Sequence, residues 1–166
     1  YDLTRLGREV SRDVFAGRPD NMWRFAELLP VFQDENIITL GEGATPLLNA
    51  SNIGKSLNMG HLFIKEEGLN PTGTFKARGL SAAISKAKEL GATGFTMPSA
   101  GNAAGAAAVY CARAGLNVKV YMPQDAPDAN KKEWLLADSE LNLVDGHIGD
   151  AGRQAVAGAA DCLSYT

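Results

Sequence analysis

Cysteine and histidine are both scarce in this sequence, with two copies of each. Cys111 and Cys162 lie far apart and form no CxxC pair, and His61 and His147 are isolated from each other. These spacings argue against a zinc site and against a disulfide framework. We expect both cysteines to be reduced, buried, small apolar residues of a cytosolic protein, and we expect no metal.

Long apolar runs are also missing. No run approaches the roughly 20 residues that cross a bilayer, and no charged-then-apolar leader precedes a cleavage site. The net charge of −3 gives no reason to expect nucleic acid or an anionic membrane as a partner. The sequence therefore predicts a cytoplasmic protein that has neither nucleic acid nor a membrane as its partner.

The 166 residues suffice for one domain with a sizeable core. The chain begins at Tyr1 without methionine, and a strand-like segment, residues 162–164, stands just before its last residues. We therefore expect it to be part of a longer protein.

Residues 1–40 are predicted to form a helical arm. A first helix ends at Gly17, and a second, capped by Asp20 or Asn21, is stopped by Pro30. The first helix rests on four apolar residues at helical spacing: Leu3, Leu6, Val10 and Val14. Because the arm has apolar surface around Trp23 but no partner of its own, it should pack on the rest of the chain, a further domain or another subunit.

Residues 41–166 are predicted to form an α/β domain. An extended segment at 45–48 enters a short helix at 50–57, and strands then alternate with helices, which implies an open parallel sheet with helices on both faces. The predicted strands are 62–66, 94–98, 118–122, 141–145 and 162–164, and the predicted helices are 75–90, 102–114, 129–139 and 149–160. The alanine-rich helix 102–114 should be buried against the sheet.

The stretch Asn-Pro-Thr-Gly-Thr-Phe-Lys-Ala-Arg-Gly, residues 70–79, joins a predicted strand to a predicted helix. Thr72 or Thr74 can cap that helix, which places Lys76 in its first turn. Cations are disfavoured there by the helix dipole. A lysine in this position is a candidate for a Schiff base or a phosphate contact, whereas a random lysine would more often be a solvated surface residue.

A second stretch, Pro-Ser-Ala-Gly-Asn-Ala-Ala-Gly at 98–105, also joins a strand to a helix. Its small residues leave backbone N–H groups bare at a helix N-terminus, which suits a carboxylate or a phosphate. Ligands of parallel sheets bind at the carboxyl ends of the strands. Both stretches are expected at such ends, so they indicate one site.

In this order, the two stretches resemble the fold-type II enzymes that use pyridoxal phosphate (PLP). The resemblance extends to Leu-Gly-Glu-Gly-Ala-Thr-Pro-Leu at 40–47 and to Met-Trp-Arg-Phe at 22–25 with Leu-Leu-Pro at 28–30, which are similar to the threonine synthase family. It covers nearly the whole chain, from about residue 1 to residue 161.

The resemblance implies a role for nine residues. Lys76 would carry the cofactor, Asn102 would hydrogen-bond the cofactor ring oxygen, and Phe75 would pack beside it. The substrate carboxylate would bind the loop of Ser99, Ala100, Gly101 and Ala103, and a substrate phosphate would contact Lys65 and Arg78. For Arg78 a surface or inter-element salt bridge is favoured over a phosphate contact, and for Phe75 a core position is at least as open as a place beside the cofactor. We assign no acid–base role to Glu66 and Glu67, because adjacent strand residues point to opposite faces.

The reaction that the resemblance implies converts O-phospho-L-homoserine and water to L-threonine and phosphate, with a homodimer as the working form. Two alternatives remain: a serine/threonine dehydratase-type PLP deaminase, and a non-catalytic α/β module that binds an anion. The sequence departs from the family at Ala77, where aspartate is usual, and at Ala100 and Ala103, where threonines are usual. The glycine run that holds the cofactor phosphate in this family comes after position 166. A second, carboxy-terminal domain is therefore expected, and residues 1–166 alone should be inactive.

Overall fold

A computed structural model of the chain describes residues 1–129, 131, 139–159 and 162–164. The helices are α1 Leu3–Glu9, α2 Arg12–Ala16, α3 Ser51–Ser56, α4 Lys76–Glu89, α5 Asn102–Ala114 and α7 Ile148–Ala157, with 3₁₀ turns η1 Met22–Leu28, η2 Asp34–Asn36 and η3 Glu67–Leu69. The strands are β1 Leu47–Asn49, β2 Phe63–Lys65, β3 Gly94–Pro98, β4 Asn117–Pro123, β5 Glu140–Val144 and β6 Leu163–Ser164.

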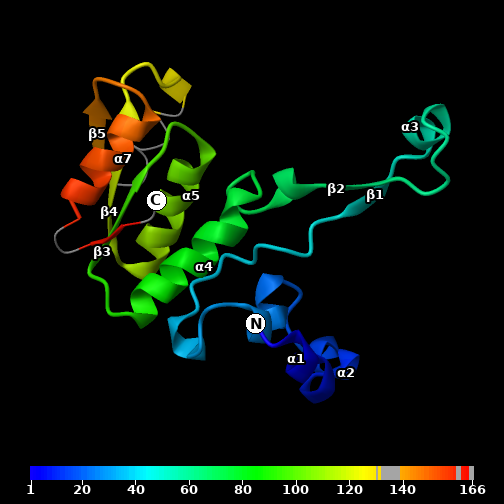
Figure 1. The fold of residues 1–166 in the computed structure, drawn as a ribbon. Helices are drawn as coiled ribbons and strands as arrows, with labels where there is room; N and C mark the ends of the chain where they lie inside the picture. Colours follow the sequence, from blue (N-terminus) through cyan, green and yellow to red (C-terminus); the bar gives the residue numbers. More distant parts are fainter. Residues whose placement is uncertain (130, 132–138, 160–161, 165–166) are drawn as a thin grey trace.

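The centre of the molecule is a parallel four-stranded sheet in the order β5-β4-β3-β6. The chain steps in one direction from β3 through α5 to β4, and it returns across the sheet from β5 through α7 to β6. Right-handed crossovers that run in opposite directions place their helices on opposite faces. Accordingly, α5 and α7 lie on opposite faces (Figure 1), which confirms the predicted fold class.

The core lies between this sheet and the pair of helices α4 and α5. Leu80 and Ile84 of α4 and Phe95 of β3 are buried in it. The small side chains of α5 let it approach both α4 and the sheet closely, and they include Ala104, Ala106, Ala107 and Ala108, all of which are buried. The prediction of a buried alanine-rich helix is therefore confirmed.

The predicted strand 62–66 does not belong to the parallel sheet. It forms β2, which pairs antiparallel with β1 so that Lys65 lies opposite Leu47. It cannot pair with β3, because both edges of β3 are occupied, by β4 on one side and by β6 on the other. With α3 between them, β1 and β2 extend away from the rest of the chain (Figure 1) and expose apolar side chains.

The arm also differs from the prediction. The first helix is split into α1 and α2 because Val10 is extended and Ser11 starts a new helix. The second is a 3₁₀ helix, η1, and its cap is Asn21, whose side chain accepts the N–H of Trp23 at 2.9 Å. Met22, Trp23 and Val31 are buried together, with Ala82 of α4 against them. The arm therefore packs on this chain itself.

The remaining predicted elements are close to the observed ones. Helix 149–160 is α7, strand 162–164 is β6, and the short helix 50–57 is α3. The predicted helix 129–139 lies almost wholly outside the described residues. Among the helices that the structure describes, none is long and apolar enough to cross a membrane.

Candidate functional site

Lys76 is the first residue of α4, as the sequence predicts. The N-cap of α4 is Phe75, so the prediction that Thr72 or Thr74 caps the helix is wrong. The Thr74 hydroxyl nevertheless accepts the Lys76 backbone N–H at 3.2 Å. The Lys76 ammonium lies 4.8 Å from the centroid of the exposed Phe75 ring, a cation–π contact that contributes about 0.5–1 kcal/mol. Among the described residues, no oxygen binds Lys76 Nζ, whereas Lys65 Nζ donates to a backbone carbonyl. The Lys76 amine is thus accessible for chemistry.

The start of α5 carries the second predicted group of residues. Ser99 is buried, and its hydroxyl accepts the N–H groups of Gly101 at 3.3 Å and Ala104 at 3.2 Å, which fixes the turn into the helix. Asn102, the first residue of α5, is exposed. Ala100 and Ala103 pack in part against the core. A rigid turn therefore presents an exposed amide side chain at a helix N-terminus.

The two helix starts lie at the same edge of the sheet. A short connection joins the end of α4 to the start of β3. Helix α4 therefore runs opposite to β3, and it begins at the edge of the sheet where β3 ends. The loop after β3 then leads directly into α5, which packs against α4. Figure 1 shows both helices beginning toward the end to which the strands point. The two helix starts thus lie toward the same edge, but the predicted reason, that each stretch follows a strand of the parallel sheet, holds only for the stretch before α5, because β2 is not in this sheet.

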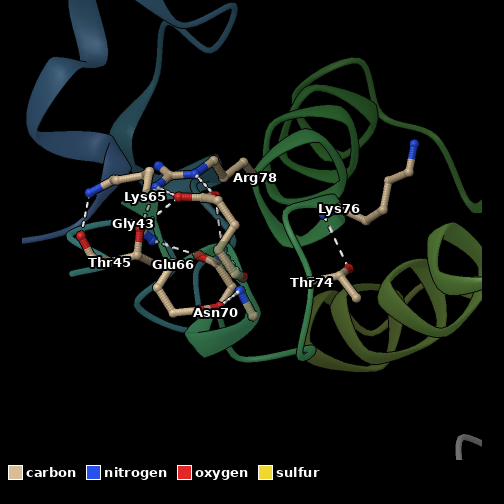
Figure 2. A network of polar contacts seen from close by, with 10 residues as sticks. Gly43, Thr45, Lys65, Glu66, Asn70, Thr74, Lys76 and Arg78 are labelled. Carbon is tan, nitrogen blue, oxygen red and sulfur yellow. Dashed lines mark hydrogen bonds and ion pairs between the residues drawn. The ribbon is translucent and has the colours of Figure 1, made fainter. Parts of the chain in front are cut away.

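Arg78 and Lys65, the predicted contacts for a substrate phosphate, belong to a separate polar network. Arg78 Nε donates to Glu67 Oε2 at 2.6 Å, and Arg78 Nη2 donates to Glu67 Oε1 at 2.8 Å. Thr45 Oγ1 donates to the same carboxylate at 2.6 Å, and Lys65 Nζ donates to the Thr45 carbonyl oxygen. In Figure 2 these residues converge on one side of α4, while Lys76 points away from them.

This network lowers the pKa of Glu67 to about 2, first through the Arg78 guanidinium and then through Thr45. Asn70 ties it to the loop before Lys76: its amide nitrogen donates to the Glu67 backbone carbonyl at 2.8 Å, and its oxygen accepts the Gly43 N–H at 3.1 Å. The salt bridge considered for Arg78 in the sequence analysis is therefore present. It holds the loop that carries Lys76 against the segment around Gly43.

The sequence analysis missed Glu42, which is fully buried between the arm and the two helices. Its carboxylate accepts hydrogen bonds from Trp23 Nε1 at 2.9 Å and from the Tyr110 hydroxyl at 2.5 Å. The available signal was a single carboxylate between two glycines, Gly41 and Gly43. That pattern is more typical of a solvated turn than of a buried ion.

Three other side chains complete the inventory. Thr72 Oγ1 is buried in the loop before Lys76 and has no hydrogen-bond partner in the described part of the chain. Cys111 is a free thiol, and its burial raises its pKa to about 12. Cys162 is also a free thiol. Among the described residues, no three side chains of histidine, cysteine, aspartate or glutamate come together in a way that could hold a metal ion.

Comparisons with known proteins give one family. The sequence profile of the family described as "Pyridoxal-phosphate dependent enzyme" matches residues 38–164. Threonine synthase from Methanocaldococcus jannaschii is 38% identical over 152 residues, which are 91% of this chain and 38% of that protein. Threonine synthase from Synechocystis sp. is 43% identical over 125 residues, 74% of this chain and 33% of that protein. The chain thus spans less than half the length of these relatives.

Solved structures agree on the fold. A diaminopropionate ammonia lyase from Escherichia coli superposes with a TM-score of 0.69 at 18% identity, covering 81% of this chain and 41% of that one. Maize serine racemase superposes with a TM-score of 0.65 at 23% identity, covering 74% of this chain and 38% of that one. At these identities the similarity shows a shared fold rather than a shared substrate.

Proposed function

Because the chain belongs to the family of pyridoxal-phosphate dependent enzymes, we propose that it is part of a threonine synthase, a PLP-dependent lyase. The reaction would convert O-phospho-L-homoserine and water to L-threonine and phosphate. The observation that carries the proposal is the shared edge at which α4 and α5 begin, because it brings toward one place a lysine amine that binds no oxygen of the described residues and a helix N-terminus suited to an anion. The threonine synthase relatives support the choice of substrate.

The residues at this edge fit the cofactor that the family implies. Lys76 offers a primary amine, the group that covalent attachment requires, and its Nζ contacts an aromatic ring and no carboxylate of the described residues. Phe75 and Asn102 are exposed beside the two helix starts, as side chains that hold a planar ring should be. When bound, PLP supplies an electron sink for a carbanion on the substrate.

Each residue then has a task in binding or proton transfer. Lys76 Nζ would hold the cofactor and would take and return the substrate proton, and Phe75, whose ring Lys76 Nζ contacts, would pack beside the cofactor. Asn102 donates to the cofactor ring oxygen. The substrate carboxylate would bind at the start of α5, in the turn of Ser99, Ala100, Gly101 and Ala103. There it would have to compete with Ser99 Oγ for the Gly101 N–H and with the Tyr121 carbonyl oxygen for the Ser99 N–H. A substrate phosphate would have to compete with Glu67 for Arg78 and with the Thr45 carbonyl for Lys65.

We propose the same division of the protein as the sequence indicates: an arm at 1–40, an α/β domain at 41–166 that carries the lysine, and a second domain outside this chain. The apolar surface of β1, α3 and β2 supports the last point, since side chains on both strands and on the helix are exposed. They include Leu47, Leu48, Ile53, Leu57, Phe63 and Ile64. That domain would supply the phosphate-binding residues, and the intact protein would work as a cytoplasmic homodimer on a small amino-acid substrate.

Product analysis of the intact gene product tests the proposal. With O-phospho-L-homoserine we expect phosphate and threonine in equal amounts, and the protein should show the visible absorbance of bound PLP. Release of ammonia from serine or threonine, without phosphate from phosphohomoserine, would instead establish the deaminase. A protein without visible absorbance and without either product would be an anion-binding module, and the proposed function would be wrong.

A further inference from the structure

Glu42 is a buried carboxylate that the proposed chemistry does not use. Oε1 accepts hydrogen bonds from Trp23 Nε1 at 2.9 Å and from Thr39 Oγ1 at 3.0 Å. Oε2 accepts from the Leu40 backbone N–H at 3.0 Å and from the Tyr110 hydroxyl at 2.5 Å. Four donors thus surround one fully buried side chain.

These donors suit a carboxylate at position 42 and conflict with a glutamine amide. An indole N–H and a backbone N–H cannot reverse direction, whereas the hydroxyls of Thr39 and Tyr110 can also accept. The two irreversible donors, from Trp23 and Leu40, point at different oxygens. A glutamine amide nitrogen donates and cannot accept, so it would face one of these two N–H groups whichever way the amide turned. A carboxylate accepts on both sides.

Burial raises the pKa of Glu42, but the hydroxyls of Ser81 and Tyr110 and the surrounding backbone N–H groups outweigh burial and leave the pKa below its ordinary value. No lysine, arginine or histidine of the described residues forms an ion pair with Glu42. The charge is instead held by hydrogen bonds, together with the more distant Arg78 guanidinium, whose pKa is raised by Glu67 first and also by the charge of Glu42. Such a group is costly unless every partner is in place.

The hydrogen bonds of Glu42 and of its partner Trp23 reach three separate parts of the chain. Trp23 belongs to η1 of the arm, and its indole N–H is shared with Ser81 Oγ of α4 at 3.0 Å. Tyr110 belongs to α5, and the Met22 N–H binds the Glu42 carbonyl oxygen at 2.8 Å. The carboxylate is therefore the point at which the arm, α4 and α5 are joined.

This point lies close to the proposed site along both helices. Ser81 follows Lys76 by five residues, which is about 7.5 Å of helix, and Tyr110 follows Asn102 by eight, which is about 12 Å. Since α4 and α5 pack directly on each other, a change in how Glu42 holds them displaces their first turns together.

We propose that the Glu42 carboxylate is a positioning residue that fixes the first turns of α4 and α5, and thereby Lys76 and Asn102, in one relative position for the cofactor. This inference rests on the proposed function for the roles of Lys76 and Asn102. Glu42 itself touches neither cofactor nor substrate.

The test uses the intact protein with Glu42→Gln, alone and combined with Trp23→Phe. Glu42→Gln should weaken PLP affinity about tenfold and shift the visible absorbance band, measured where circular dichroism shows the protein fully folded. Trp23→Phe removes one irreversible donor, so in the double variant the amide nitrogen can face Thr39 while its oxygen accepts from Leu40. The double variant should therefore bind PLP within about threefold of Trp23→Phe alone.

The matched control combines Glu42→Gln with Tyr110→Phe. The Tyr110 hydroxyl can reverse, so its removal does not relieve the conflict between Trp23 and Leu40, and this pair should show no recovery. Glu35→Gln, at an exposed carboxylate of the same arm, should leave affinity and absorbance unchanged. A folded Glu42→Gln protein with the affinity and band of the wild type would overturn the proposal, as would equal recovery by Trp23→Phe and Tyr110→Phe.

A cofactor-independent readout separates this inference from the proposed function. Amide hydrogen exchange in residues 76–80 and 102–106 should be faster in Glu42→Gln and slow again in the double variant with Trp23→Phe. If the wild-type protein binds no PLP, the proposed function is wrong. The exchange rates of these amides still test whether Glu42 fixes the first turns of α4 and α5. If Glu42→Gln does not fold, the proposal is tested with the single variant Tyr110→Phe. The folded Tyr110→Phe protein should show faster amide exchange in residues 102–106, and unchanged exchange there would overturn the proposal.

Discussion

Lys76 and Arg78 stand two positions apart at the start of α4, yet their side chains point to different sides of the helix (Figure 2). Residues at this spacing are separated by about 200° around a helix. Arg78 is bound to Glu67 through two nitrogens, whereas the Lys76 ammonium contacts only the Phe75 ring among the described residues. One helix turn thus combines a structural cation with a chemically available amine.

The first prediction follows from that difference. Reduction of the PLP-loaded intact protein with borohydride should attach the cofactor covalently to Lys76, and Lys76→Ala should abolish the labelled peptide in a mass spectrum. Lys55→Ala, at an exposed lysine of α3, should leave the labelling unchanged. Label that persists in Lys76→Ala, or that appears on Lys65, would show that the lysine has been assigned wrongly.

The second prediction concerns Asn102. Because its side chain is exposed at the start of α5, Asn102→Ala should change the free energy of unfolding by no more than about 0.5 kcal/mol. It should nevertheless shift the visible absorbance of the bound cofactor and lower turnover by at least tenfold, since a hydrogen bond to the ring oxygen is lost. Asn52→Ala, on the exposed surface of α3, is the matched control. Equal turnover in the two variants would remove Asn102 from the site.

Local patterns in the sequence predicted the parts of the site that local structure determines. The small residues of α5 predict a helix that can be buried against a sheet, and turn residues before Lys76 and Asn102 predict two helix starts. These features depend on neighbours a few positions away. The structure therefore reproduces the two helix starts, although Phe75 and not a threonine is the N-cap of α4.

Long-range partners decide the features that the sequence analysis missed. Strand β2 has the composition of a sheet strand, but it can pair with β3 only if an edge of β3 is free. One edge is occupied by β6, whose Leu163 pairs with Phe95 of β3, 68 positions earlier in the chain. Glu42 reads as a turn residue, but its burial depends on Trp23 and on Tyr110, which is 68 positions away. No short window of sequence contains that information.

The third prediction concerns Gly43, which has φ +110° and lies directly against the arm. A Cβ at this position would lie 2.5 Å from the Met22 backbone nitrogen and 3.0 Å from the Asn21 carbonyl carbon. Backbone atoms cannot yield cheaply, so Gly43→Ala should lower the free energy of unfolding by about 2–4 kcal/mol.

Gly41 provides a control that isolates the close approach. It also has positive φ, +89°, but no atom lies within 4 Å of a Cβ built on it. Gly41→Ala should therefore show only the backbone strain, about 1–2 kcal/mol in urea denaturation. Equal losses in the two variants would mean that the arm does not pack on Gly43 as described.

The last prediction is the pH dependence of the Arg78–Glu67 pair. The pKa of Glu67 is lowered from 4.5 to about 2, first by the Arg78 guanidinium. A carboxyl with a depressed pKa in the folded state contributes stability that is fully present above about pH 4.5 and is lost as the pH falls toward 2. Glu67→Gln should therefore lower the free energy of unfolding at pH 7, and this loss should shrink progressively between pH 4.5 and 2.

The loss at pH 7 should be about 1–2 kcal/mol, less than the pKa change alone implies, because the Glu67 and Arg78 side chains are 25% and 33% exposed and solvent screens them. Arg78→Gln should produce the same pH profile, and the double variant should lose little more than either single one, since both remove one interaction. Urea denaturation at several pH values measures all four proteins. A constant difference between wild type and Glu67→Gln from pH 7 to 2 would show that the pair does not hold the Lys76 loop through its charge.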